Sequence, residues 1–249
     1  MKTAILSDVH ANLEALTACM AHARQQGAGR FVFLGDLVGY GADPVACLAL
    51  VRTELARGGL AVRGNHDEAA LGGLCEDLNF IARDSTYWTR TQLGPAEREL
   101  LASLPLQLRD GAAHYVHASA FDPASWEYII GTATARRCLA ASDAPIVFAG
   151  HVHQPLLYYT APGDIGEIKT FAATPGVAVP LSSRRRWLVL GGSVGQPRDG
   201  NPAAAYQMFD EAERNVAWHR VPYDHAAAAR KIIAAGLPAM LARRLAYGE

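Results

Sequence analysis

Apolar runs alternate with helical patterns at the start of the chain. The run TAILSD at residues 3–8 predicts a short buried strand, and the segment after it places Leu13 and Leu16 at helical spacing. Asn12 is a residue type that caps helices at their amino end, and Gly27 is a type that ends them. The pattern therefore predicts one strand followed by one helix within the first 27 residues.

The order of strand and helix repeats between residues 30 and 67. RFVFLGD predicts a second strand, and GLAVRGNHD predicts a third strand with a polar loop after it. Between them, Asp43 and Pro44 are typical of a helix cap and a first helical position. Because strands that alternate with helices usually pair in parallel, this region predicts a largely parallel sheet covered by helices.

The rest of the chain predicts three further regions. Residues of about 68–104 follow a helical pattern, which predicts an inserted helical cap. An Asp-Gly pair at 110–111 separates two strand-like runs, as in a tight hairpin, and several short strands follow up to about residue 221. Two helices are predicted at about 224–247, with a break at 236–238. An α/β core with a second, more antiparallel sheet is the natural assembly.

Length and charge narrow the class of protein. The chain has 249 residues, half of them hydrophobic, which is enough to bury a substantial core in one large domain or at most two. Its formal net charge of -1 argues against nucleic-acid binding through a broad basic surface, because that affinity requires many clustered Lys and Arg side chains. The one basic run, at 184–186, precedes the strand-like WLVLGG, where an exposed hairpin turn is the better interpretation.

Cysteine usage and the amino terminus predict the compartment. Cys19, Cys47, Cys75 and Cys138 stand singly, so they predict neither a zinc ribbon nor a disulfide framework, and they fit a reducing cytosol. The apolar stretch before Asp8 is too short for a signal peptide, and no segment approaches the roughly 18 apolar residues of a membrane span. We therefore expect a soluble, cytoplasmic protein with no membrane partner.

Side chains of metal-binding type follow five of the apolar strands. They are Asp8, His10 and Asn12; Asp36; Asn65, His66 and Asp67; His117; and His151 with His153. Each alone could be a turn residue, a helix cap or a satisfied polar group. Since ligands bind in the crevice beyond the carboxyl ends of parallel strands, the full set predicts one shared metal site. Imidazoles with carboxylates suit Mn, Fe, Zn, Co or Ni, and the lack of thiolates argues against structural zinc.

The roles of the two histidines in the stretch AGHVHQP are not determined by the pattern alone. If a regular strand continued through them, the two-residue spacing would place His151 and His153 on one face. They could then be two ligands of one metal ion, one ligand with a bystander, or ordinary loop residues. Gly35, Gly64 and Gly150 precede three of the polar segments and would let the backbone approach a ligand closely.

The polar segments form an ordered set of motifs. D-x-H, G-D, G-N-H-D, H and G-H-x-H begin at Asp8, Gly35, Gly64, His117 and Gly150. This set resembles the signature of the calcineurin-like metallophosphoesterases, and most closely their compact bacterial phosphodiesterase-type branch. The resemblance implies a single domain over residues 1–249, with an α/β fold of four layers. That fold is an α-β-β-α sandwich of two mostly mixed β-sheets flanked by helices, with a helical cap insertion.

The family's site residues carry over position by position and imply a site for two divalent metal ions. One ion would be held by Asp8, His10 and His153, the other by Asn65, His117 and His151, and Asp36 would bridge the two. His66 would donate a proton to the leaving oxygen, Asp67 would orient His66, and neutral Asn65 would preserve the Lewis acidity of its ion. Two such ions can bind phosphoryl oxygens and lower the pKa of a water molecule for in-line attack on phosphorus.

The resemblance implies a small phosphoester as the substrate, and the absence of one residue predicts which type of ester it is. Protein phosphatases and symmetrical dinucleoside tetraphosphatases of this superfamily have an Arg soon after the Asp of G-D, where a guanidinium fork grips a terminal phosphate. Here Asp36 is followed by LVGYGADP, without Arg. That favours a phosphodiesterase, with a phosphomonoesterase or protein phosphatase, or a dinucleoside polyphosphate hydrolase, as alternatives. A catalytically silent metal-binding scaffold is the alternative from another class, although every ligand position and His66 are present.

Two segments are candidates for contact with substrate. The Gly-rich loop 191–200 includes Arg198, which could supply a guanidinium fork, although a plain hairpin loop is an equally good interpretation. Tyr128 and Trp126 in SWEYI could stack a nucleobase, as could the aromatic residues of 79–90, although aromatic residues at helical spacing are more often core. The pattern leaves the oligomeric state open.

Overall fold

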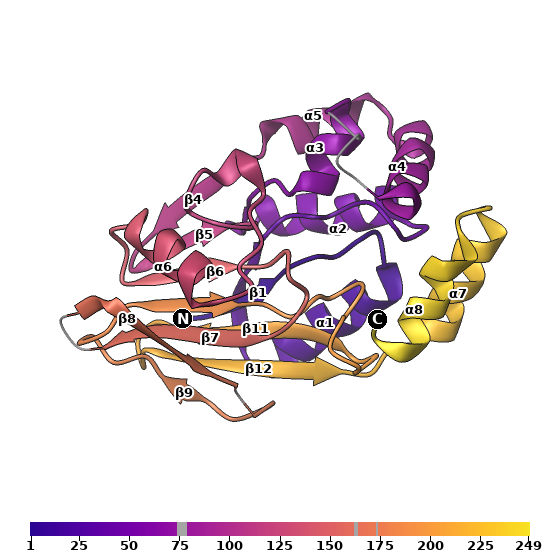
Figure 1. Cartoon of the computed structure of the whole chain (residues 1–249). Helices are drawn as coiled ribbons and strands as arrows, with labels where there is room; N and C mark the ends of the chain where they lie inside the picture. Colours follow the sequence, from indigo (N-terminus) through magenta and orange to yellow (C-terminus); the bar gives the residue numbers. More distant parts are fainter. Residues whose placement is uncertain (74–78, 162–163, 173) are drawn as a thin grey trace.

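Two six-stranded mixed sheets lie face to face in the computed structural model, which describes residues 1–73, 79–161, 164–172 and 174–249 (Figure 1). The first sheet has the order β3 (Leu60–Ala61), β2 (Ala28–Phe33), β1 (Lys2–Leu6), β11 (Ala204–Asp210), β12 (Asn215–Val221) and β9 (Val179–Pro180). The second has the order β4 (Gln107–Asp110), β5 (Ala113–Val116), β6 (Ile146–Ala149), β10 (Trp187–Leu190), β7 (Leu156–Ala161) and β8 (Asp164–Phe171).

Parallel pairs form one half of the first sheet and the centre of the second, and antiparallel pairs complete each sheet. β1, β2 and β3 pair in parallel, as do β5, β6 and β10. β11, β12 and β9 continue the first sheet in antiparallel register, and β4, β7 and β8 do so in the second. The predicted hairpin at residues 110–111 is present between β4 and β5. The prediction of two mixed sheets is confirmed.

Helices cover the outer face of both sheets, which makes the four layers. α1 (Leu13–Gln25) and α2 (Pro44–Leu55) pack on the first sheet, and α6 (Thr132–Ala140) packs on the second. Both faces of β1 are buried, because Ala4 and Leu6 pack toward the helices while Ile5 packs between the two sheets. This is why the sequence of this short strand is a continuous apolar run. The four-layer α-β-β-α sandwich is confirmed.

One of the two predicted helix caps makes a capping hydrogen bond, and the other does not. Asn12 caps α1, because its side-chain oxygen accepts from the amide of Ala15 at 3.1 Å. Asp43 precedes α2 but makes no capping hydrogen bond. Its carboxylate instead accepts from Lys231 Nζ at 2.8 Å, a contact with the C-terminal helices that the local sequence does not reveal.

Five further helices lie beside the strand ends. The predicted cap consists of α3 (Asn65–Leu71), α4 (Phe80–Gln92) and α5 (Pro95–Ser103), and its segment 74–78 lies outside the described residues. α7 (His225–Ala234) and α8 (Ala239–Tyr247) form the predicted C-terminal pair and pack against Tyr40 and α4. In Figure 1 the cap and this yellow pair stand on the same side of the strands.

Two predictions about the whole chain have partial outcomes. Cys19, Cys47 and Cys138 are free thiols, and Cys75 falls in the segment that is not described. Within the described ranges, none of the helices has the length and apolar character needed to cross a membrane.

Candidate metal centre

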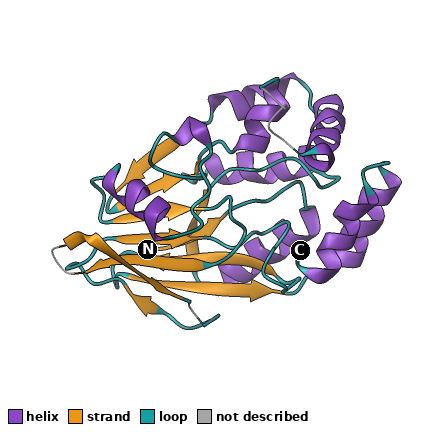
Figure 2. Cartoon of the chain, viewed as in Figure 1, coloured by secondary structure: helices purple, strands orange, loops and turns teal. Residues whose placement is uncertain are grey.

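Loops at the carboxyl ends of six strands converge on one region of the molecule. Three follow β1, β2 and β3 of the first sheet, and three follow β5, β6 and β10 of the second. Figure 2 shows loops gathered between the strands and the helices of the cap and C-terminus. The seven side chains predicted to bind metal lie on these loops or at the start of α3: Asp8, His10, Asp36, Asn65, His117, His151 and His153. Six of the seven are buried, and Asn65 is half-buried.

The first cluster of donor atoms consists of Asp8, His10 and His153. His153 Nε2 lies 3.3 Å from Asp8 Oδ1 and 3.1 Å from His10 Nε2. His10 and His153 come from opposite sheets, 143 positions apart in the chain. Only the face-to-face packing of the sheets brings them together.

The tautomers in this cluster test whether a cation fits there. His10 Nδ1 faces the carbonyl oxygen of Val38 at 3.3 Å, and His153 Nδ1 faces that of Gln196 at 2.6 Å. Because a carbonyl only accepts, each Nδ1 carries the hydrogen and each Nε2 presents a lone pair. When neither Nε2 carries a proton, the two lone pairs face each other at 3.1 Å and repel, and a cation bound by both removes that repulsion. The cluster therefore fits a metal ion.

The second cluster is built around His117. Its Nε2 lies 3.0 Å from Asn65 Oδ1 and 3.0 Å from His151 Nδ1. Its Nδ1 donates to the carbonyl of Leu34 at 2.8 Å, which turns Nε2 toward the other donors of this cluster. His151 Nε2 is buried without a hydrogen-bond partner among the described residues. Asp36, His117 and His151 form a group with metal-binding geometry.

Asp36 lies between the two clusters. Its Oδ2 is 3.7 Å from His10 Nε2 and 3.4 Å from His117 Nε2, so one carboxylate oxygen faces both sets of donors. Its Oδ1 accepts from the amide of His66 at 2.8 Å. Asp36 also belongs to a third group of donors, with His10 and His66.

Burial and mutual charge set the protonation of the cluster without metal. Burial lowers the pKa of His10 and of His151, the latter to about 3, so both imidazoles are neutral. Burial acts to raise the pKa of Asp36, but the neighbouring His117 and His66 outweigh it and hold that pKa well below its usual value, so the carboxylate stays charged. Burial lowers the pKa of His117, while Asp36 raises it to about 9. A metal ion at His117 would displace a proton there.

The loops that carry the predicted metal ligands contain several residues with positive φ. Asp8, His10, Asp36, His151 and His153 all have φ between +48° and +66°, in the left-handed region. Side chains other than Gly adopt this region rarely and at a cost of about 1–3 kcal/mol each, and such residues concentrate at functional sites. His151 and His153 are therefore not on a continued strand, and each points into a different cluster.

Gly64 lies so close to Asp36 that a larger residue at this position is expected to destabilise the protein. It stands before α3 at extended φ and ψ of -100° and 174°, and a Cβ there would collide with Oδ1 and the amide nitrogen of Asp36. We expect Gly64→Ala to lower the free energy of unfolding of the metal-free protein by about 1–3 kcal/mol, the usual effect of overpacking. Urea denaturation measures it. Gly131→Ala is the matched control, because Gly131 also precedes a helix in extended conformation but has open space around it. Equal losses would contradict the steric argument.

Comparison with known proteins identifies the family. The calcineurin-like phosphoesterase superfamily domain matches residues 1–214. The chain belongs to this superfamily. The Methanocaldococcus jannaschii protein MJ0912, named as uncharacterised, is 32% identical over 251 residues, which cover 99% of this chain and 98% of the relative.

Two crystal structures have folds similar to that of this chain. A metallophosphoesterase from Sphaerobacter thermophilus has a TM-score of 0.88 at 39% identity, over 100% of this chain and 99% of its own. The hypothetical protein PH1004 from Pyrococcus horikoshii OT3 has a TM-score of 0.79 at 19% identity, over 100% and 98%. The second likeness concerns the fold alone.

Asp67 has a different role in the structure from the one expected. Its Oδ1 accepts from the amides of Leu37 and Val38 at 2.8 and 3.1 Å, and its Oδ2 accepts from Gly64 at 2.9 Å. None of its hydrogen bonds within the described ranges goes to His66. Asp67 therefore fixes the loop after Asp36 against the start of α3, and it holds His66 only through the backbone.

His66 lies beside the first cluster without a fixed partner. Its ring packs edge-on against His10, with 5.0 Å between centroids, and 4.4 Å from the ring of Tyr40. Its Nδ1 is buried with no hydrogen-bond partner among the residues the structure describes. Burial lowers its pKa, so the imidazole is neutral in the absence of substrate.

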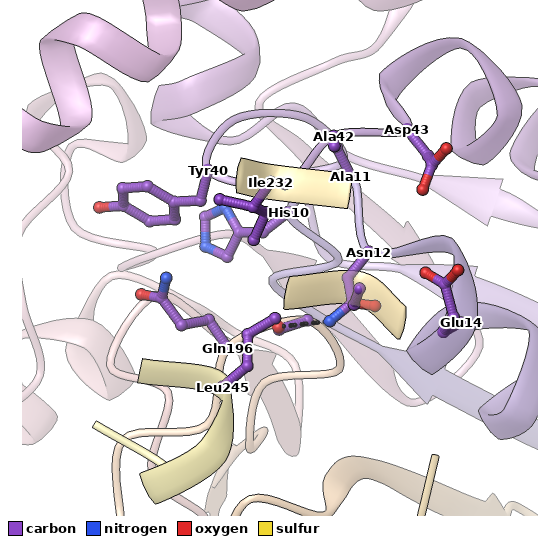
Figure 3. A pocket seen from close by; sticks show the side chains of 13 residues that line it. His10, Ala11, Asn12, Glu14, Tyr40, Ala42, Asp43, Gln196, Ile232 and Leu245 are labelled. Atoms are coloured by element: carbon purple, nitrogen blue, oxygen red, sulfur yellow. Dashed lines mark hydrogen bonds between the residues drawn. The ribbon is translucent and has the colours of Figure 1, made fainter. Parts of the chain in front are cut away.

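Both predicted substrate-contact residues reach the site, and two others accompany them. The ring of Tyr128 lies 3.9 Å from that of His151, and Arg198 lies over Tyr40, with 5.8 Å between the guanidinium carbon and the ring centroid. Tyr40 and Gln196, which none of the sequence motifs includes, lie with His10 around one pocket (Figure 3). The sequence signal for Tyr40 is an aromatic residue between two glycines of the motif loop, and the structure shows that its side chain is buried.

Proposed function

We propose that this protein hydrolyses phosphoesters with two divalent metal ions. The observation that carries the proposal is the pair of facing lone pairs on His10 and His153, next to a second donor cluster that shares Asp36. Membership of the phosphoesterase superfamily supports the same reaction class. When bound, two such ions would activate phosphoryl oxygens and a water molecule by Lewis-acid chemistry.

The proposed ligands divide by cluster. Asp8, His10 and His153 would hold one ion, Asn65, His117 and His151 the other, and Asp36 would bridge them. The single oxygen of Asp36 that faces both clusters supports the bridging role. Imidazole and carboxylate donors suit Mn, Fe, Zn, Co or Ni, and cellular supply would select among them.

His66 is the proposed proton donor. Its free Nδ1 and its place beside His10 leave it available to a substrate, while its backbone amide is held by Asp36. A phosphoryl anion bound nearby raises the pKa of a neutral imidazole, since opposite charge favours the protonated form. The imidazolium can then give its proton to the departing oxygen.

The substrate that we propose first is a small or nucleotide-like phosphodiester, because no Arg follows Asp36 as it does in the superfamily's protein phosphatases. Tyr128 would form a wall beside His151 for an aromatic substituent, and its exposed fraction of 48% leaves its ring accessible. Phosphomonoesters are the second candidate, because Arg198 lies at the site although it comes from another loop.

The test is hydrolysis by one metal-reconstituted preparation. We expect Mn(II)-loaded protein to cleave bis(p-nitrophenyl) phosphate, within a panel that includes p-nitrophenyl phosphate, cyclic nucleotides and dinucleoside polyphosphates. Turnover is followed by release of nitrophenol or phosphate, and metal content by plasma emission. Two bound ions without turnover on any ester and with any divalent metal would contradict the proposal and favour a silent scaffold.

A further inference from the structure

The loop after β10 makes hydrogen bonds to the Asp8 loop and to His153, which both contribute to the first metal cluster. Val194 and Gly195 donate their amides to the carbonyls of Ser7 and Asp8 at 2.9 Å each. The carbonyl of Gln196 accepts from His153 Nδ1 at 2.6 Å. A Cβ at Gly195 would collide with the carbonyl of Val9, so this close approach requires Gly. The loop is therefore a rigid support whose position is fixed by the metal ligands themselves.

This loop places the side chain of Arg198 beside Tyr40, which packs against His10 of the first metal cluster. Arg198 Nη2 donates to Gln196 Oε1 at 3.1 Å and lies 3.4 Å from the hydroxyl of Tyr40. Nε also donates to Gln196 Oε1, at 3.3 Å. The positive charge of Arg198 acts on the pKa of Tyr40, of Tyr128 and of His66, which lie around both metal clusters.

Arg198 has neutral partners only, within the part of the chain that the structure describes. Its hydrogen bonds go to an amide and a phenol, and none of the ion pairs involves it. The neighbouring Asp199 pairs with Arg220 instead. A guanidinium that is held in place but not neutralised keeps its charge for an anionic ligand and loses little entropy on binding it.

Gln196 adds a second donor that has no partner. The residue is 1% exposed, its Oε1 holds Arg198, and its Nε2 makes no hydrogen bond within the described residues. In Figure 3 its carboxamide lies on the same side of His10 as the ring of Tyr40. Because a buried amide donor costs free energy when unpaired, its position favours a polar ligand beside Arg198.

We propose that Arg198 binds a phosphoryl oxygen that the two metal ions leave free, and that Gln196 positions it. The inference rests on the proposed function of the site. Two oxygens of a phosphoryl group suffice for two metal ions, and a phosphomonoester has a third non-bridging oxygen, whereas a diester does not. Arg198 therefore extends the substrate class to phosphate monoesters, and it stands in place of the Arg that is missing after Asp36.

Binding of inorganic phosphate to the Mn(II)-loaded protein tests the proposal without turnover. We expect Arg198→Ala to weaken phosphate binding about 10- to 100-fold in calorimetric titration, as for a lost charge-assisted hydrogen bond. Arg198→Lys should recover only part of the affinity, since an ammonium lacks the fork. Gln196→Leu should also weaken phosphate binding, but by less than Arg198→Ala. Its metal content should be unchanged, because the backbone carbonyl of residue 196, not the side chain, holds His153. Arg184→Ala, which removes one exposed charge, is the control.

Two comparisons decide the outcome. An unchanged phosphate affinity in Arg198→Ala, or no phosphate binding by the wild type, would overturn the role of Arg198. Among esters, Arg198→Ala should lower kcat/KM more for p-nitrophenyl phosphate than for bis(p-nitrophenyl) phosphate, and an equal loss would overturn the assignment to a third oxygen. If no ester is hydrolysed while phosphate binding still depends on Arg198, the proposed function and the assignment to monoesters fail, while the phosphate contact of Arg198 stands.

Discussion

Replacing Asp36 with Asn is expected to reduce metal content at both positions and to remove nearly all turnover. The same oxygen of Asp36 faces His10 and His117, so losing its charge affects both clusters at once. Two cations close together require shared negative ligation, since like charges repel strongly in a buried site. Removing one donor that stabilises a transition state costs about 10²- to 10³-fold, and we expect a loss of more than about 10³-fold here.

The measurement is metal per chain after reconstitution, together with turnover at saturating Mn(II). Asp224→Asn is the matched control, because it makes the same chemical change at a helix cap where Asn serves equally well. It should keep two ions and full activity. If the Asp36→Asn protein retains both ions, the bridging role is contradicted, while loss of a single ion would assign Asp36 to one cluster only.

The fold followed from the sequence because its signals are local and repeated. Apolar strands, Asn12 at a helix start and the Asp-Gly hairpin each specify structure within a few residues, and their order limits the topology. The site followed for a related reason. Every predicted ligand stands shortly after a strand, and the packing of two sheets brings the strand ends together without further information.

Other features depend on contacts between distant segments. Asp43 has the sequence of a helix cap, yet a lysine 188 positions away binds its carboxylate. Asp67 was expected to orient His66, yet the loop after Asp36 presents two amides that take one of its oxygens. The place of Arg198 depends on where a Gly-rich loop fastens to the Asp8 loop, which periodicity cannot predict.

The absence of Arg after Asp36 does not by itself define the substrate class. It excludes a guanidinium from that segment of the chain, not from the site. Arg198 reaches the neighbourhood of Tyr40 and His66 from a loop 158 positions beyond Tyr40. Substrate class therefore depends on which groups converge on the metal clusters, and the esters compared above address that point directly.

His66→Gln is expected to keep both metal ions and to lose turnover in proportion to the basicity of the leaving group. Gln preserves polarity and approximate size but cannot transfer a proton at neutral pH. General acid catalysis contributes about 10²- to 10⁴-fold, so we expect a loss in that range on alkyl phosphoesters, whose alkoxide must be protonated. Nitrophenolate leaves without protonation, so the loss on bis(p-nitrophenyl) phosphate should be much smaller.

The ratio of the two losses separates the roles that His66 could have. A metal ligand would lower metal content, which is a real alternative because His66 forms a donor group with His10 and Asp36. A residue that only packs against Tyr40 would lower kcat equally on both esters. Only a proton donor predicts two retained ions together with a loss that grows as the leaving group becomes more basic.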